Sequence, residues 1–82
     1  MPYGNKVIPV EVKSGATGRL RSLHQFIDRA DHGVAVRLYA GKLSVEEAVT
    51  LAGKEYRLLN LPYYLASRIE GYLDWVLEST GS

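Results

Sequence analysis

Apolar and polar residues alternate near the start of the chain and predict a β-strand over Val7–Lys13. Residues 1–6 before it are predicted to form a turn centred on Gly4 and Asn5. Successive side chains of a strand point to opposite faces. The face that we assign to the core consists of Ile8, Val10 and Val12. The opposite face consists of Val7, Pro9, Glu11 and Lys13. Because proline cannot donate to a β-ladder, we expect an unpaired edge or a bulge at Pro9.

A helix is predicted from about residue 19 to about residue 31, because apolar residues recur there at helical spacing. The apolar stripe consists of Leu20, Leu23, Phe26, Ile27 and Ala30. Gly33 is typical of a helix end, and Val34–Tyr39 is predicted to be a second strand. A strand, a helix and a strand in this order indicate a βαβ crossover with two parallel strands.

Residues 41–60 have two interpretations. The spacing of Val45, Ala48, Leu51 and Ala52 fits a short helix, whereas the interpretation that we favour has strands at Val45–Thr50 and Tyr56–Leu59 around a turn at residues 52–54. Pro62 is then predicted to open a C-terminal helix, where proline is favoured. Its buried stripe consists of Leu65, Ile69, Tyr72, Leu73 and Val76. The predicted fold class is therefore α/β, with a small mixed sheet, a βαβ unit and a C-terminal helix.

Composition limits the classes of protein to consider. The 82 residues predict a single domain over residues 1–82, and the absence of cysteine excludes disulfides and thiolate zinc sites. Ten basic and nine acidic residues give a net charge of +1, which is not the signature of a strong electrostatic binder of nucleic acid. The chain has no apolar run of the ~20 residues that span a membrane, and its start lacks the apolar region of a signal peptide. We therefore predict a cytoplasmic protein without a membrane partner.

Glu11 and Lys13 are the candidate catalytic residues. Two residues apart on a strand, they point to the same side, which is the arrangement that a metal-dependent phosphodiesterase uses. Glu11 would help to hold a divalent ion, and Lys13 would stabilise charge on the attacked phosphate or steer the water nucleophile. The competing interpretation is an ordinary pair of exposed charges on a half-buried strand.

Longer stretches of the chain carry a family resemblance. They are residues 7–15, 20–26, 36–41 and 58–65, which together span most of the chain. These stretches resemble the nuclease-like C-terminal domain, of unknown function, of prokaryotic AAA-type ATPases. That domain is similar to the PD-(D/E)xK restriction-endonuclease-like superfamily. The resemblance implies a partial restriction-endonuclease-like core in which Glu11 is the second acidic metal ligand and Lys13 is the catalytic lysine.

The chain also departs from the superfamily pattern. Residues 1–10 contain neither Asp nor Glu, so the first acidic ligand expected upstream of Glu11 is missing. The phosphate loop of the ATPase part is absent as well, so the chain resembles a truncated, C-terminal piece of a longer protein. Glu11 alone supplies too few ligands for Mg²⁺. We expect no nuclease activity from the isolated chain and no cofactor, with Mg²⁺ binding only if the site is completed.

Further side chains are weaker candidates. Arg19 and Arg21 follow the connector after Lys13 and could bind phosphate, with a solvated surface role as the alternative. His24 is predicted to be a structural histidine and Gln25 to be exposed. His24 and His32 are predicted not to form a metal site. The side chains with two open interpretations, a partner-binding patch or a wider core face, are Tyr64, Arg68 and Trp75.

The sequence leaves three functions to compare. The leading interpretation is a catalytically incomplete restriction-endonuclease-like domain, a DNA-associated or regulatory appendage of an AAA-type ATPase. The second is a protein-interaction or oligomerisation module with no nucleic-acid role. The third is a Mg²⁺-dependent nuclease whose site is completed by another chain. Because an open sheet edge recruits other strands, we also predict a homo-oligomer, with Val7–Val12 pairing across the interface.

Overall fold

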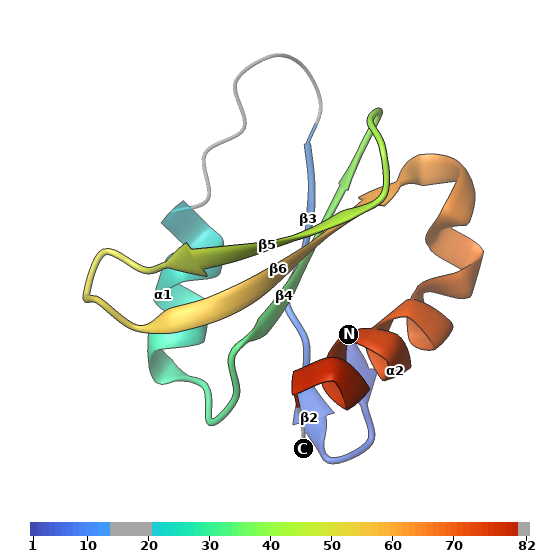
Figure 1. The fold of residues 1–82 in the computed structure, drawn as a ribbon. Coiled ribbons are helices and arrows are strands. Elements are labelled where there is room, and N and C mark those ends of the chain that lie inside the picture. Colours follow the sequence, from blue (N-terminus) through green and yellow to red (C-terminus); the bar gives the residue numbers. More distant parts are fainter. Residues whose placement is uncertain (14–20, 81–82) are drawn as a thin grey trace.

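The computed structural model describes residues 1–13 and 21–80, with the side chains of residues 1–13 and 23–78 (Figure 1). Six strands and two α-helices, the second preceded by a 3₁₀ helix, follow one another along this part of the chain. Their order is β1 (Pro2–Tyr3), β2 (Lys6–Val7), β3 (Val10–Val12), α1 (Arg21–Arg29), β4 (Val34–Tyr39), β5 (Ser44–Val49), β6 (Glu55–Pro62), η1 (Tyr63–Arg68) and α2 (Ile69–Thr80). The predicted α/β class is therefore confirmed.

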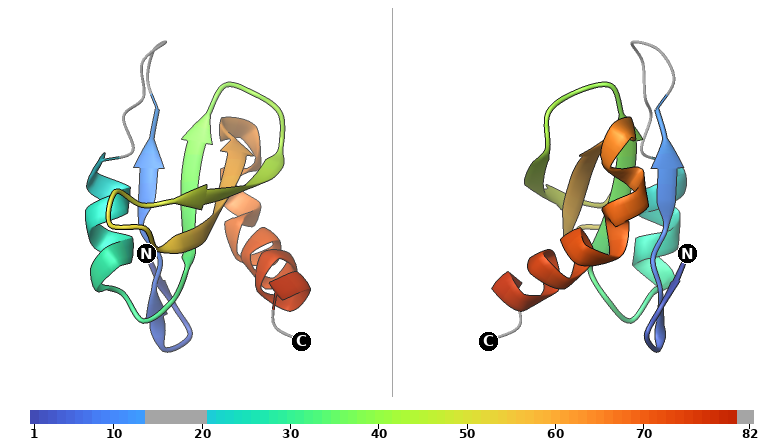
Figure 2. Two further views of the ribbon diagram at one scale, coloured as in Figure 1. Left: turned by 60° about the vertical axis from the view of Figure 1, so that its left-hand side comes forward. Right: turned by 90° about the vertical axis from the view of Figure 1, so that its right-hand side faces the viewer.

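The main sheet has four strands in the order β3-β4-β6-β5. β3 and β4 pair in parallel, as the βαβ prediction requires, and β4 and β6 are also parallel. β5 pairs with β6 in the antiparallel sense, which makes the sheet mixed as predicted. The two α-helices lie on opposite sides of this sheet (Figure 2).

The strand predicted over Val7–Lys13 is two short strands. β1 and β2 form their own hairpin around the predicted turn at Gly4 and Asn5, and β3 begins only at Val10. Pro9, which has no N–H to donate, separates β2 from β3, while its carbonyl oxygen accepts a hydrogen bond of 3.0 Å from the Val36 amide. The missing donor thus marks the point where the chain leaves one sheet and enters the other.

The extended interpretation of residues 41–60 is confirmed, because β5 and β6 form a hairpin. Its turn passes through Gly53, whose φ of 96° lies in the left-handed region that favours glycine. Beside the turn, the Lys54 ammonium donates hydrogen bonds of 2.7 Å to the carbonyl oxygens of Ile27 and Ala30. These carbonyls lie at the end of α1, where helical partners run out. Lys54 therefore ties α1 to the hairpin.

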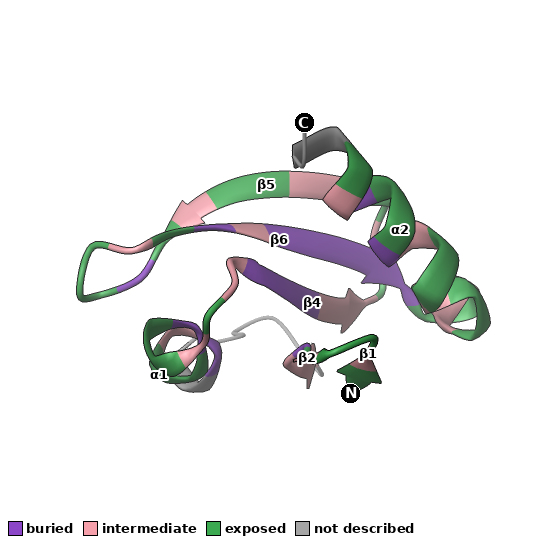
Figure 3. Ribbon diagram, turned by 90° about the horizontal axis from the view of Figure 1, so that it is seen from below, coloured by how far each residue is buried: buried purple, intermediate pink, exposed green. Residues whose placement is uncertain are grey.

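Each face of the sheet has its own hydrophobic cluster. Figure 3 shows the buried stretches of β4 and β6 in the centre of the sheet. The cluster on the α2 face is built from Ile8, Val34, Val36, Leu59, Leu61, Leu73 and Val76. The cluster on the α1 face is smaller and is built from Leu23, Ile27, Ala35, Tyr56 and Leu58. Because β6 runs between β4 and β5, most of its residues are buried from both sides.

Three details of the sequence prediction need correction or refinement. Val12, assigned to the core, is 58% exposed, because it lies at the end of the edge strand opposite Leu38, which is itself only half-buried. Phe26, assigned to the buried stripe of the first helix, is also exposed. Pro62 ends β6 and precedes η1, so the C-terminal segment begins as a 3₁₀ helix and becomes α-helical at Ile69. None of the helices in the described segments is long and apolar enough to cross a membrane.

Candidate functional site

Glu11 and Lys13 lie where β3 ends. Glu11 is the central residue of β3, and Lys13 continues the ladder beyond it, its amide donating a 2.8 Å hydrogen bond to the Leu38 carbonyl oxygen. The Tyr63 hydroxyl donates to the Lys13 carbonyl oxygen and so fixes the end of β3 against the start of η1. Both charged residues are half-buried. The backbone therefore has the extended geometry that directs the two side chains to one face.

A row of polar residues crosses the sheet at the level of Glu11. In register, Glu11 pairs with Arg37 on β4, Arg37 with Asn60 on β6, and Asn60 with Ser44 on β5. Paired residues on neighbouring strands point to the same face, so the four side chains line up across the α1 side of the sheet. We call Glu11, Arg37, Asn60 and Ser44 the polar row.

The polar row begins where the apolar cover of α1 stops. The preceding positions on the same face are Ala35 on β4 and Leu58 on β6, and both belong to the cluster beneath α1. One alternation further along, the chain places Arg37 and Asn60 instead. These positions approach the carboxyl ends of the parallel strands, which is where open α/β sheets bind ligands.

Hydrogen bonds connect the row and hold Arg37 in place. Arg37 Nε donates to Asn60 Oδ1 at 2.8 Å, and Asn60 Nδ2 donates to Ser44 Oγ at 3.1 Å. The Arg37 guanidinium also lies over the Tyr39 ring, 5.6 Å from its centroid. Its charged partner is Glu46, with Nη2 and Oε1 3.8 Å apart. Arg37 is thus oriented on several sides by neutral groups but has a distant counter-charge.

Glu11 and Lys13 differ from Arg37 in having no such contacts. Among the described residues, neither the Glu11 carboxylate nor the Lys13 ammonium has a hydrogen-bond or ion-pair partner. A half-buried charge without a partner is costly for folding alone.

Tyr56 is a further buried polar group on this face. It is 3% exposed, and its hydroxyl has no hydrogen-bond partner within the described part of the chain. Burial raises the pKa of the Tyr56 hydroxyl; the Arg37 charge acts against this shift and the Glu46 charge adds to it. Its ring packs edge-to-face on His24, with centroids 5.6 Å apart, which agrees with a structural role for that histidine.

The remaining sequence candidates fall outside the polar row. Arg19 lies outside the described residues, and so does the side chain of Arg21, the first residue of α1. Gln25 is exposed, as predicted. His32 contacts the backbone: Nε2 lies 2.7 Å from the Val7 carbonyl oxygen, and Nδ1 accepts from the Val34 amide at 3.2 Å.

The C-terminal aromatic residues do not widen the core. Tyr64 and Trp75 are both exposed, so the core alternative for them is wrong. Trp75 instead borders a shallow hollow of about 330 Å³ between α2 and the loop before β5, together with Leu43, Arg68, Gly71 and Tyr72.

The sequence prediction missed Arg37, Asn60, Ser44 and Tyr56 as site residues. The signal that could have found two of them is a single polar residue inside an otherwise apolar strand. Arg37 interrupts the run of Val34–Tyr39, and Asn60 stands between Leu59 and Leu61. A central strand buried on both faces is normally apolar throughout, so each exception has a specific reason.

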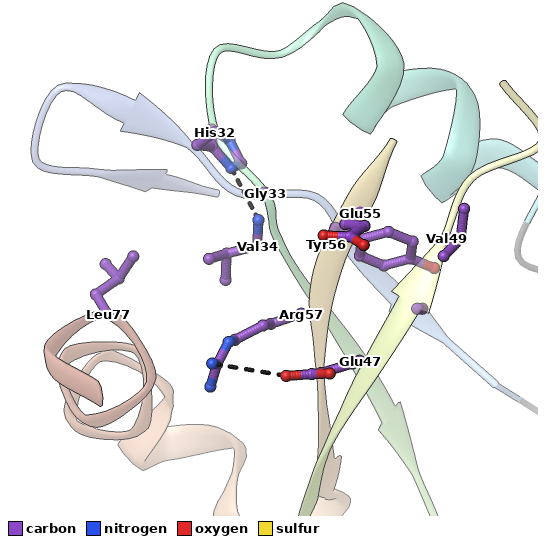
Figure 4. A pocket seen from close by; sticks show the side chains of 10 residues that line it. His32, Gly33, Val34, Glu47, Val49, Glu55, Tyr56, Arg57 and Leu77 are labelled. Atoms are coloured by element: carbon purple, nitrogen blue, oxygen red, sulfur yellow. Dashed lines mark hydrogen bonds and ion pairs between the residues drawn. The ribbon is translucent and has the colours of Figure 1, made fainter. Parts of the chain in front are cut away.

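A larger cavity lies where β4 and β6 begin, at the opposite end of these strands from the polar row (Figure 4). It measures about 640 Å³ and is bordered by β4, β5, β6 and α2. Its charged pair is Arg57 and Glu47, with Nη2 and Oε1 3.8 Å apart. Neither Glu11 nor Lys13 borders it. This cavity is therefore separate from Glu11 and Lys13, and its Arg57–Glu47 ion pair serves as a comparison for the Arg37–Glu46 pair.

Metal ligands are sparse around Glu11. Within the described ranges, no three His, Cys, Asp or Glu residues are grouped closely enough to hold an ion. The other carboxylate on this face of the sheet is Glu46 on β5, three strand spacings or roughly 14 Å away across the sheet. Glu11 and Glu46 therefore cannot share an ion whose ligands lie about 2 Å from it.

No protein-family model, curated protein or solved structure matches this chain. The resemblance to the nuclease-like domain of AAA-type ATPases stays a prediction.

Proposed function

We propose that this chain is a restriction-endonuclease-like domain that associates with DNA without cleaving it alone, as the C-terminal appendage of an AAA-type ATPase. The observation that supports the proposal is the state of Glu11 and Lys13. They are half-buried, lie on consecutive same-side positions of an extended edge segment, and have no partner among the described residues. Lys13 would contact a backbone phosphate as a point charge.

The proposed lack of cleavage follows from ligand chemistry. Mg²⁺ requires near-octahedral oxygen coordination and is usually held by one or two carboxylates together with substrate phosphates. Glu11 contributes one carboxylate, and Glu46 is too far away to contribute a second. Two-metal or one-metal hydrolysis of a phosphodiester needs a better-held ion than this side chain provides.

Salt-dependent DNA binding tests the proposal. Lys13→Ala should weaken binding of a duplex oligonucleotide and lower the slope of log K against log salt by about one, as expected for one lost phosphate contact. The matched control is Lys42→Ala, which removes the same charge from an exposed position in the loop between β4 and β5, outside the polar row. Equal losses in both variants, or no DNA binding by the natural chain, would refute the proposal.

Cleavage assays separate the incomplete domain from an active nuclease. We expect no Mg²⁺-dependent cleavage by the purified chain. Cleavage that disappears in Glu11→Ala would instead support the third function, in which another chain supplies the missing carboxylate.

A second candidate is self-association through the β3 edge. No described strand pairs with the outer side of β3, and the exposed apolar residues Val12 and Phe26 border a groove along it. Such an edge can pair with a strand of another copy. Light scattering at increasing concentration should then show an oligomer that Val12→Lys dissociates, whereas a monomer at high concentration would exclude this candidate.

A further inference from the structure

We infer that Arg37 anchors a phosphate-binding subsite on the α1 face of the sheet, beside Glu11 and Lys13. The identity of its ligand as a nucleic-acid backbone rests on the proposed function, whereas binding of a phosphate group as such does not. Asn60 and Ser44 are positioning residues of this subsite, because they act through Arg37.

The first argument is the incomplete compensation of the Arg37 charge. Its side chain is only 14% exposed, and its charged partner is a single carboxylate 3.8 Å away on Glu46, which is 54% exposed. A buried charge is stable when it is closely paired and fully hydrogen-bonded. A long ion pair to a solvated carboxylate is weak. An incoming phosphate would therefore provide the close counter-charge that the Arg37 guanidinium lacks within the protein.

The second argument is a comparison with the equivalent pair on the other face. Arg57 on β6 and Glu47 on the adjacent strand β5 are likewise 3.8 Å apart, whereas Arg37 on β4 reaches Glu46 across β6, and the side chains of Arg57 and Glu47 are 33% and 84% exposed. Water can solvate Arg57 where it cannot reach most of Arg37. Both pairs join an arginine to a glutamate at the same separation, and the cation of the proposed subsite is the more deeply buried of the two.

The third argument is the orientation of the guanidinium. The Asn60 amide is fully buried, and its Nδ2 donates to Ser44, so its Oδ1 faces Arg37 and accepts the Nε–H. With Nε occupied and the ring of Tyr39 beside it, the guanidinium cannot rotate freely. Its terminal N–H groups then form a prepared donor set, and arginine is well suited to phosphate for this reason.

Two neighbours support the assignment. Glu11 is in register with Arg37, which places the Lys13 cation on the same face and one alternation further along the adjacent strand. Tyr56 provides a second buried polar group on this face whose hydrogen-bonding capacity is unused among the described residues. The face thus combines two cations, Arg37 and Lys13, with two carboxylates, Glu11 and Glu46, and a hydroxyl without a partner among the described residues.

The test is a titration of the whole chain with inorganic phosphate and, separately, with a duplex oligonucleotide. The Arg37 Nε–Hε resonance, observed by NMR in the natural chain, should shift with either ligand. Arg37→Gln should weaken binding roughly tenfold, the effect of losing a hydrogen bond from a charged donor. The matched variant Arg57→Gln should change affinity less than twofold. Circular dichroism verifies that both variants fold. If Arg37→Gln does not fold, the shift of the Arg37 Nε–Hε resonance in the natural chain decides whether Arg37 binds phosphate.

The outcomes separate this inference from the proposed function. DNA binding that needs Lys13 but not Arg37 would overturn the inference and leave the proposed function standing. Arg37-dependent binding of inorganic phosphate without any DNA binding would support the subsite and refute the proposed function. If neither ligand moves the Arg37 resonance, or if Arg57→Gln weakens binding as much as Arg37→Gln, the subsite does not exist.

Discussion

The two faces of the same four-stranded sheet are built on different principles. On the α2 face, the inward positions of the central strands β4 and β6 at the level of the polar row remain aliphatic, and Leu73 and Val76 of α2 pack with them. On the α1 face, the apolar positions stop after Ala35 and Leu58, and Arg37 and Asn60 follow. Strand alternation therefore lets one face hold the fold together while the other presents buried polar groups. Polar chemistry can be placed in the centre of such a small domain because Val36, Leu59 and Leu61 on the opposite side of the same strands are fully buried in the larger cluster.

The largest expected effect is on the α2 face. Leu61 is completely buried in the larger cluster, so Leu61→Ala should lower the free energy of unfolding by about 2–5 kcal/mol. A domain this small has little stability to lose, so the variant is expected to be substantially unfolded. Urea denaturation followed by circular dichroism measures the change. The control is Val12→Ala at the exposed edge, and similar losses in both variants would contradict the assignment of the core.

The second prediction concerns how α1 is attached. Its cluster is small, and Lys54 adds two hydrogen bonds to the carbonyl oxygens of Ile27 and Ala30. Lys54→Met keeps the aliphatic stem but removes these bonds, so we expect a loss of about 1.5–3 kcal/mol in the same denaturation experiment. Lys42→Met is the exposed control. A loss no greater than that of the control would show that apolar packing alone holds α1.

The third prediction compares Glu46 and Glu47, the partners of Arg37 and Arg57. Glu46 lies next to Arg37 and would compete with an anionic ligand, so Glu46→Gln should tighten phosphate or DNA binding roughly two- to fivefold, the range of a weak ion pair. Glu47 is paired with Arg57 on the other face, and Glu47→Gln removes the same charge there. Fluorescence anisotropy with a labelled oligonucleotide compares them at one salt concentration. Equal tightening would indicate a general effect of net charge instead of competition at Arg37.

The smallest effect is expected at Tyr56. Because burial raises its pKa above 10.0, the folded chain holds the phenol proton more strongly than the unfolded chain. The corresponding stability is present below pH 10 and is lost as the pH rises through the folded-state pKa. Tyr56→Phe should therefore lose less stability than the natural chain between pH 9 and about pH 11. Tyr64→Phe, at an exposed position, should follow the natural chain, and identical curves for all three proteins would argue against the raised pKa.

Much of the fold could be predicted from local patterns. The parallel pair of β3 and β4 follows from the strand–helix–strand order, and the β5–β6 hairpin follows from two β-rich runs around Gly53. The extended backbone at Glu11 was also predictable from alternation. The errors lie at strand boundaries and at the sheet edge. Pro9 divides the first predicted strand. Val12 is exposed because β3 is an edge strand, and the residues around Val12 in the sequence do not reveal that position in the sheet.

The sequence by itself determined the α/β class and the placement of Glu11 and Lys13 on one side of a strand, because these depend on residues that are neighbours in the chain. Only the tertiary structure decided that β6 lies between β4 and β5, and therefore that Arg37 meets Asn60, 23 residues later, and that Ser44 completes the row. The physical reason is that the register between strands depends on long-range packing of both faces at once. Periodicity along one strand identifies which side a residue occupies, whereas the partner across the ladder is chosen by the whole sheet.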